Sequence, residues 1–153
     1  MRFRCQPSAI PRHPSLIRVN AAAWPEQLGR PDLLDRPDDA TWSPLEYAAH
    51  VRDLFRIFHE RLYLMLGQEQ PAFANWDQDA TAVAERYYEQ DPAVVAEELV
   101  AAADALARAY SAVDDTNLGR TGLRSDGSTF TVESLARYFI HDPVHHLHDV
   151  SGG

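Results

Sequence analysis

Residues 43–67 constrain the fold of this chain more than any other segment, because they carry every signal of a long amphipathic helix. Ser43 suits the N-cap, Pro44 suits the first helical position, and Glu46 completes a capping box. Apolar side chains then recur every three or four residues, at Tyr47, Val51, Leu54, Phe58, Leu62 and Met65. Gly67 ends the pattern, which predicts a helix of about 24 residues, roughly 36 Å long. A helix of this length needs partners that cover its apolar stripe.

Other segments also carry helix signals, and the alternation typical of strands is almost absent. The predicted helices cover about residues 14–29, 92–113 and 131–150, with a short additional helix at about 79–89. Asp91 and Pro92 repeat the cap chemistry found before the 43–67 helix. We therefore predict an all-α fold, a four-helix bundle over residues 15–150, with an N-terminal arm at residues 1–14.

The connection lengths indicate how the helices are directed. About a dozen residues join the first two long helices, which permits them to be antiparallel neighbours. Residues 68–90 form a long crossover connection between helices two and three, long enough to run the length of the bundle. Helix three can then lie parallel to helix two, and helix four antiparallel to it. Residues 114–129 are polar and contain glycines, so we expect a loop there.

Composition excludes several classes of partner. The chain has 14 basic and 23 acidic residues, a net charge of −9, which argues against a nucleic-acid or anionic-membrane partner. No apolar run approaches the roughly 18 residues of a membrane span. The N-terminus lacks the continuous apolar stretch of a signal peptide, and the single cysteine, Cys5, fits a reducing compartment. We therefore expect a cytoplasmic protein.

The C-terminal helix gathers imidazoles. Four of the seven histidines fall between positions 141 and 148, namely His141, His145, His146 and His148. His141 and His145 are one turn apart, so they share a face on which two imidazoles can chelate one ion. His148 falls on that face too, whereas His146 is expected to point elsewhere.

His50 is the candidate third ligand, because it lies in the apolar sector of helix two. It is about 10 Å from the start of its helix, and His145 is about 8 Å from the end of the last helix. If the two helices are antiparallel, these side chains reach the same depth of the bundle. The residues predict a metal site formed by His50, His141 and His145.

A simpler reading of the cluster stays open. Histidines near a helix C-terminus interact favourably with the helix dipole and can be solvated. The strongest apolar stripe of the last helix faces away from His141 and His145, and Pro143 is expected to kink that helix. The pattern alone leaves a metal site and a solvated cluster as alternatives.

Several neighbours have two readings each. Glu46 is either a capping residue or a hydrogen-bond partner of His50. Trp76, in the crossover, either covers the site or anchors the packing. Arg120 and Arg124 either bind an anionic substrate or lie in a solvated loop, and Asp142 is expected at the surface.

The segments TWSPLEYAAHVRD and YFIHDPVHHLHDV together resemble the DinB-like superfamily, of the YfiT and mycothiol-dependent maleylpyruvate isomerase type. The resemblance covers about residues 15–150. It implies a four-helix bundle with a divalent metal, zinc or nickel, held by His50, His141 and His145. The additional imidazole of His148 departs from that pattern, as a replacement ligand or a neighbour of the ligands.

The resemblance also implies an activity. Many such proteins look like S-transferases or isomerases that depend on a low-molecular-weight thiol, so mycothiol or bacillithiol is expected as cosubstrate beside a small-molecule substrate. The same site would serve a metal-assisted hydrolase. A non-catalytic bundle that binds a small molecule or acts in a stress response is the other alternative. An exposed apolar helix face would permit a homodimer.

Overall fold

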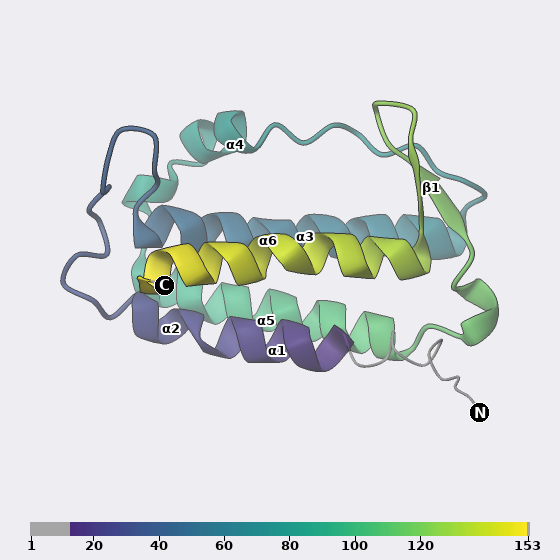
Figure 1. The fold of residues 1–153 in the computed structure, drawn as a ribbon, viewed down its shortest axis with the longest axis horizontal. Helices are drawn as coiled ribbons and strands as arrows, with labels where there is room; N and C mark the ends of the chain where they lie inside the picture. Colours follow the sequence, from purple (N-terminus) through teal and green to yellow (C-terminus); the bar gives the residue numbers. More distant parts are fainter. Residues whose placement is uncertain (1–12, 153) are drawn as a thin grey trace.

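The computed structural model describes residues 13–152, which form a bundle of long helices lying side by side (Figure 1). The four helices of the bundle are α1, together with its short continuation α2, and then α3, α5 and α6. Their bounds are α1 His13–Ala22, α2 Trp24–Gln27, α3 Pro44–Gly67, α5 Pro92–Ser111 and α6 Val132–Ser151. The predicted four-helix bundle is confirmed. Residues 1–12 of the predicted N-terminal arm, Cys5 among them, lie outside the described residues, whereas residues 13 and 14 belong to α1.

The helix directions agree with those expected from the connection lengths. α3 and α5 run the same way, while α1 and α6 run opposite to them (Figure 1). Between α3 and α5 the chain returns along the bundle through α4 Gln78–Ala84 and the 3-10 turn η2 Tyr87–Glu89. This return carries Trp76 and its neighbours over the side of the bundle.

The start and end of α3 are those that the sequence predicts. The Ser43 hydroxyl accepts from the Glu46 amide, and the Glu46 carboxylate accepts from the Ser43 amide. The Arg36 guanidinium also donates to Glu46, with Nε 2.9 Å from Oε1. These bonds satisfy the free amides of the first turn and fix where the helix begins.

The first predicted helix is interrupted. A turn at Ala23 separates α1 from α2, because Pro25 has no amide hydrogen to continue the α-helical ladder. The indole of the fully buried Trp24 donates to Asn20, and the Asn20 amide donates to the Pro143 carbonyl at 3.0 Å. The break therefore coincides with a buried hydrogen-bonded link between α1 and α6.

A small hairpin replaces the loop expected over residues 114–129. After the 3-10 turn η3 Asp115–Asn117, β1 Thr121–Leu123 pairs antiparallel with β2 Thr129–Thr131. The Phe73 amide donates to the Leu123 carbonyl at 2.8 Å, so the hairpin also holds the return segment. Strands of three residues are too short to show the alternation that a sequence pattern requires.

Gly122 in β1 lies against the ring of Phe73, and a side chain at this position would not fit. A Cβ atom there would lie 2.8 Å from Phe73 Cε2 and closer still to Cζ. Phe73 is buried, so its ring would have to move. We expect Gly122→Ala to lower the free energy of unfolding by about 1–3 kcal/mol, measured by urea denaturation.

Gly119→Ala is the matched control, because no atom lies within 4 Å of a Cβ built there. An equal loss of stability in both variants would contradict the contact as the cause.

Within residues 13–152, no helix is both long and apolar enough to cross a membrane.

Candidate metal centre

His50 is a fully buried imidazole without a hydrogen-bond partner. It lies on α3, its exposed fraction is 0%, and neither Nδ1 nor Nε2 is hydrogen-bonded. Burial lowers the pKa of His50 to about 4, with a further contribution from His146, so the ring is neutral at neutral pH. Leaving buried polar atoms unpaired costs stability, and such atoms in a native fold call for an explanation.

The side chain that faces His50 is His146 of α6. The two ring centroids are 5.0 Å apart at an interplanar angle of 81°, and Nδ1 of His146 is also buried without a partner. Burial is the main cause that lowers the pKa of His146. Two neutral imidazoles from antiparallel helices therefore meet with three unpartnered ring nitrogens, and unprotonated nitrogen is the form that binds a metal.

Aromatic rings enclose this pair. Trp76 stacks on His50 at 5.4 Å and 10°, and Trp42 contacts the same ring at 5.2 Å. Tyr47 packs on His146 with centroids 4.9 Å apart. The indole of Trp76 donates to Thr81 Oγ1 at 2.9 Å, which holds the tryptophan in place. Both readings of Trp76 thus apply, since it packs and it covers the centre.

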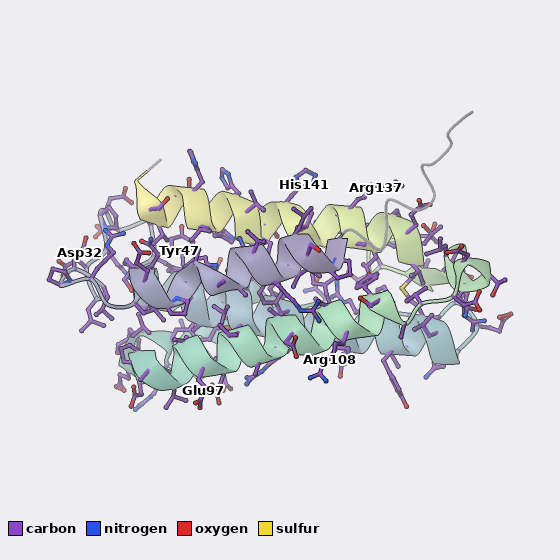
Figure 2. All side chains as sticks on the ribbon, turned by 90° about the horizontal axis from the view of Figure 1, so that it is seen from below. Asp32, Tyr47, Glu97, Arg108, Arg137 and His141 are labelled. Carbon is purple, nitrogen blue, oxygen red and sulfur yellow. The ribbon has the colours of Figure 1, made fainter. Side chains whose placement is uncertain are left out.

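The predicted trio of His50, His141 and His145 does not assemble. His141 is exposed on the outer side of α6, away from the other helices (Figure 2). The side chain of His145 is 72% exposed, and its Nε2 lies 3.4 Å from Asp149. His148 is exposed as well. Throughout residues 13–152, no three side chains of the His, Cys, Asp or Glu type are grouped closely enough to hold an ion.

The position of each histidine around α6 explains why His146, rather than His141 or His145, faces α3. The buried stripe of α6 runs through Leu135, Phe139, Pro143 and Val150, with His146 in the same series of three- and four-residue steps. α6 continues unbroken through Pro143, so the stripe can be followed past it without a change of face. His141 and His145, which form the H-x-x-x-H pattern, lie on a different face of α6. The buried stripe therefore determines that His146 faces α3.

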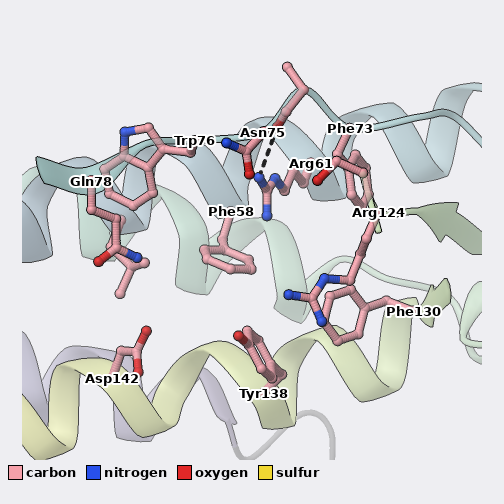
Figure 3. Close-up of a pocket in the computed structure, with 13 residues that line it drawn as sticks. Phe58, Arg61, Phe73, Asn75, Trp76, Gln78, Arg124, Phe130, Tyr138 and Asp142 are labelled. Atoms are coloured by element: carbon pink, nitrogen blue, oxygen red, sulfur yellow. Dashed lines mark hydrogen bonds between the residues drawn. The ribbon is translucent and has the colours of Figure 1, made fainter. Parts of the chain in front are cut away.

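Asp142 is the acidic group associated with the pair. It lies one turn before His146, on the same face, and its charge raises the pKa of that histidine against the larger effect of burial. It also lines a pocket together with Trp76, so it is not simply a surface residue (Figure 3). A carboxylate at this position is a suitable third donor for a site with two imidazoles.

The other candidates have clear roles. Glu46 is occupied by its cap and by Arg36, and it makes no bond to His50. Arg120 donates to the backbone oxygens of Met65 and Gln68, at 2.6 and 2.9 Å, and so ties the hairpin region to the end of α3. Arg124 lines the same pocket as Asp142.

Comparison with known proteins identifies the family and the fold of this chain. The family model of the DinB superfamily matches residues 18–150, a span that includes His50 and His146. Among solved structures the chain is similar to YfiT from Bacillus subtilis, which is described as a probable metal-dependent hydrolase with an unusual four-helix bundle topology. The TM-score is 0.88 at 16% identity, over 99% of this chain and 89% of that one, a likeness that concerns the fold. No curated protein matches the chain. The chain therefore belongs to the DinB superfamily.

Proposed function

We propose that this protein is a metal-dependent enzyme whose divalent cation is held by His50 and His146, with Asp142 as third ligand. The observation that carries the proposal is the pair of facing imidazoles, one fully and one partly buried, with three buried ring nitrogens that have no partner. A bound cation would pair one nitrogen of each ring, where an unpaired buried nitrogen otherwise destabilises the fold. Asp142 would have to turn toward the pair, since it is not within ligand distance of both rings.

The donor set fits the metal expected from the sequence. Imidazole nitrogen and carboxylate oxygen suit zinc, and imidazole also suits nickel. Three protein donors leave a coordination position open, as is usual in catalytic zinc sites. Such an ion supplies a positive charge that lowers the pKa of a water or thiol bound at the open position.

The protein's own residues prepare the surroundings. Trp42, Tyr47 and Trp76 shield the two histidines from water, which strengthens electrostatic interactions inside the centre. Low pKa values keep both imidazoles free of protons that would compete with the metal. We expect the activated group to be a thiol, mycothiol or bacillithiol, in an S-transfer or isomerisation reaction of a small molecule. Hydrolysis is the second candidate, favoured by the description of YfiT.

The decisive experiment combines metal analysis with a paired assay. Protein purified without added metal is expected to carry about one equivalent of zinc or nickel. The protein is then incubated with a panel of electrophiles in the presence of mycothiol or bacillithiol, and separately with esters and amides in water. Turnover should stop when the metal is removed by chelation and return when zinc is added back.

The outcomes separate the candidates. Turnover that requires the thiol supports the transferase, and turnover in water alone supports the hydrolase. Bound metal without turnover in either assay would favour a non-catalytic bundle, and protein that binds no zinc or nickel would contradict the proposal as a whole.

A further inference from the structure

A small cavity adjoins the histidine centre and is lined by two arginines and several aromatic side chains. Its volume is about 120 Å³, and it lies between α3, α6, the return segment and the hairpin (Figure 3). Trp76 and Asp142 line the end nearest the histidines. Arg61 of α3 and Arg124 of the hairpin line the rest, together with Asn75 and Tyr138.

The two guanidinium groups are held on aromatic faces. The Arg61 Cζ atom lies 5.2 Å from the ring centroid of Phe58 and 5.1 Å from that of Phe73. The Arg124 Cζ atom lies 5.0 Å from Phe130 and 5.4 Å from Tyr138. Stacking of this kind fixes the plane of each guanidinium while leaving its edge donors available.

Arg61 and Arg124 differ from most other arginines of the described residues, which pair with a carboxylate. Among the described residues, no ion pair joins Arg61 or Arg124 to a carboxylate, and Arg61 donates only to the Ala74 carbonyl, at 3.2 Å. In a chain with a net charge of −9, acidic residues outnumber basic ones, so two unpaired arginines side by side need an explanation. Burial, and then repulsion from Arg124, lowers the pKa of Arg61. An anion between the two would relieve that repulsion.

We propose that this cavity binds the carboxylate end of a small organic acid, with Arg61 and Arg124 as the groups that recognise it. Guanidinium donors match a carboxylate in paired hydrogen bonds. Phe58, Leu54 and Phe130 line the cavity as well, so the body of the ligand next to the carboxylate is apolar.

Size limits the ligand further. A cavity of about 150 Å³ holds one benzene ring in another protein, so a volume of about 120 Å³ takes the carboxylate end of an acid and part of a body the size of one ring. With its carboxylate at the arginines, the opposite end of the ligand would lie toward Trp76 and Asp142, beside the two histidines. This inference rests on the proposed function for the idea that such an acid is the substrate, whereas binding of the acid itself does not require the metal.

The test measures binding of benzoate to the metal-free full-length protein by isothermal titration calorimetry. Benzamide, which has the same shape without the charge, and inorganic phosphate are titrated in parallel. We expect benzoate to bind at least about tenfold more tightly than benzamide, because hydrogen bonds to charged groups would be lost. Equal affinity for benzoate and benzamide, or no binding of benzoate, would overturn the proposal. Tighter binding of phosphate than of benzoate would show a simple anion site instead, and would also overturn it.

Variants locate the site. Arg61→Gln and Arg124→Gln are each expected to weaken benzoate binding by at least about tenfold. Arg137→Gln is the matched control, since Arg137 is exposed on the outer side of α6 and pairs with Glu133 (Figure 2). A loss in the control equal to that in the other two would mean a general charge effect and would contradict the assignment. The comparison of benzoate with benzamide on the unaltered protein decides the matter even if a variant fails to fold.

The two proposals fail separately. Benzoate binding that depends on Arg61, in a protein that takes up no zinc or nickel, would retain the acid site and remove the proposed metal enzyme. One equivalent of metal in a protein that does not bind benzoate would retain the proposed metal enzyme and remove the acid site.

Discussion

Replacing His146 with alanine is expected to weaken zinc binding by more than about 100-fold, because a direct ligand matters more than the outer groups whose loss costs about 10–100-fold. His50→Ala should have the same effect. The reason is geometric, since the centroids of these two rings are 5.0 Å apart and both rings carry buried nitrogens without a partner. Competition with a chromophoric chelator measures the affinity directly.

The histidines on the outer side of α6 give matched controls. His145→Ala removes a neighbouring imidazole that is mostly exposed and paired with Asp149, so the zinc affinity should be unchanged. His141→Ala should also have no effect. If His145→Ala abolished zinc binding while His146→Ala did not, the ligands would be the predicted trio of His50, His141 and His145. The pair of His50 and His146 would then be wrong.

A second pair of variants tests the carboxylate. Asp142→Asn keeps the size of the side chain and removes the charge, so it should weaken zinc binding, while Asp149→Asn should not. Equal affinity in Asp142→Asn and the unaltered protein would exclude Asp142 as a ligand and leave the two imidazoles alone.

The metal-free protein is expected to lose about 3 kcal/mol of unfolding free energy through His50 as the pH falls from 6.5 to about 4. The pKa of His50 is about 4 in the folded protein, against the ordinary histidine value of 6.5 that applies to the unfolded chain. Between these values the unfolded chain takes up a proton that the folded protein does not. Acid therefore favours unfolding, and this contribution to stability is fully present only above pH 6.5.

Urea denaturation in the presence of EDTA, at a series of pH values, measures this effect. His50→Leu should flatten the pH dependence in that window and raise stability at every pH, because the leucine has no polar atom to leave unpaired. The difference between the two proteins removes the contributions of carboxyl groups that titrate in the same range. An exposed control, His141→Leu, should retain the full pH dependence. Identical pH dependence in His50→Leu and the unaltered protein would contradict the role assigned to burial.

Long helices with strong caps were predictable from the sequence. The capping box of Ser43 and Glu46 placed the start of α3, and the stripe ending at Met65 placed its end. The length of the 68–90 connection indicated the parallel course of α3 and α5. In each case the signal is local or depends on chain length alone, so no knowledge of packing is needed.

Features that depend on contacts between distant segments were missed. β1 has three residues and is stabilised by pairing with β2 and by the amide of Phe73, none of which leaves a periodic pattern. The break at Ala23 does have a local signal, the proline at position 25. The apolar pattern continues over residues 14–29, however, and so predicted one uninterrupted helix.

Of the candidate site, the sequence indicated the position of His50 but not its neighbour on α6. His50 stood out because it is a polar residue in an apolar stripe, and it is buried as expected. On α6 the spacing of His141 and His145 marked two residues of one face, but spacing does not say which face meets the bundle. The apolar stripe does, and His146 lies between Pro143 and Val150 in its series of three- and four-residue steps. The thiol cosubstrate and the homodimer stay predictions.

The parallel course of α3 and α5 affects how proteins of this topology can diverge. The chain has to travel the length of the bundle between these helices (Figure 1), and the Trp76 ring of this stretch stacks on that of His50. Changes in its length or composition would alter what enters the centre while leaving the contacts between the long helices intact. Selectivity can therefore evolve in this segment, and the packing of the long helices can be conserved while the substrates change.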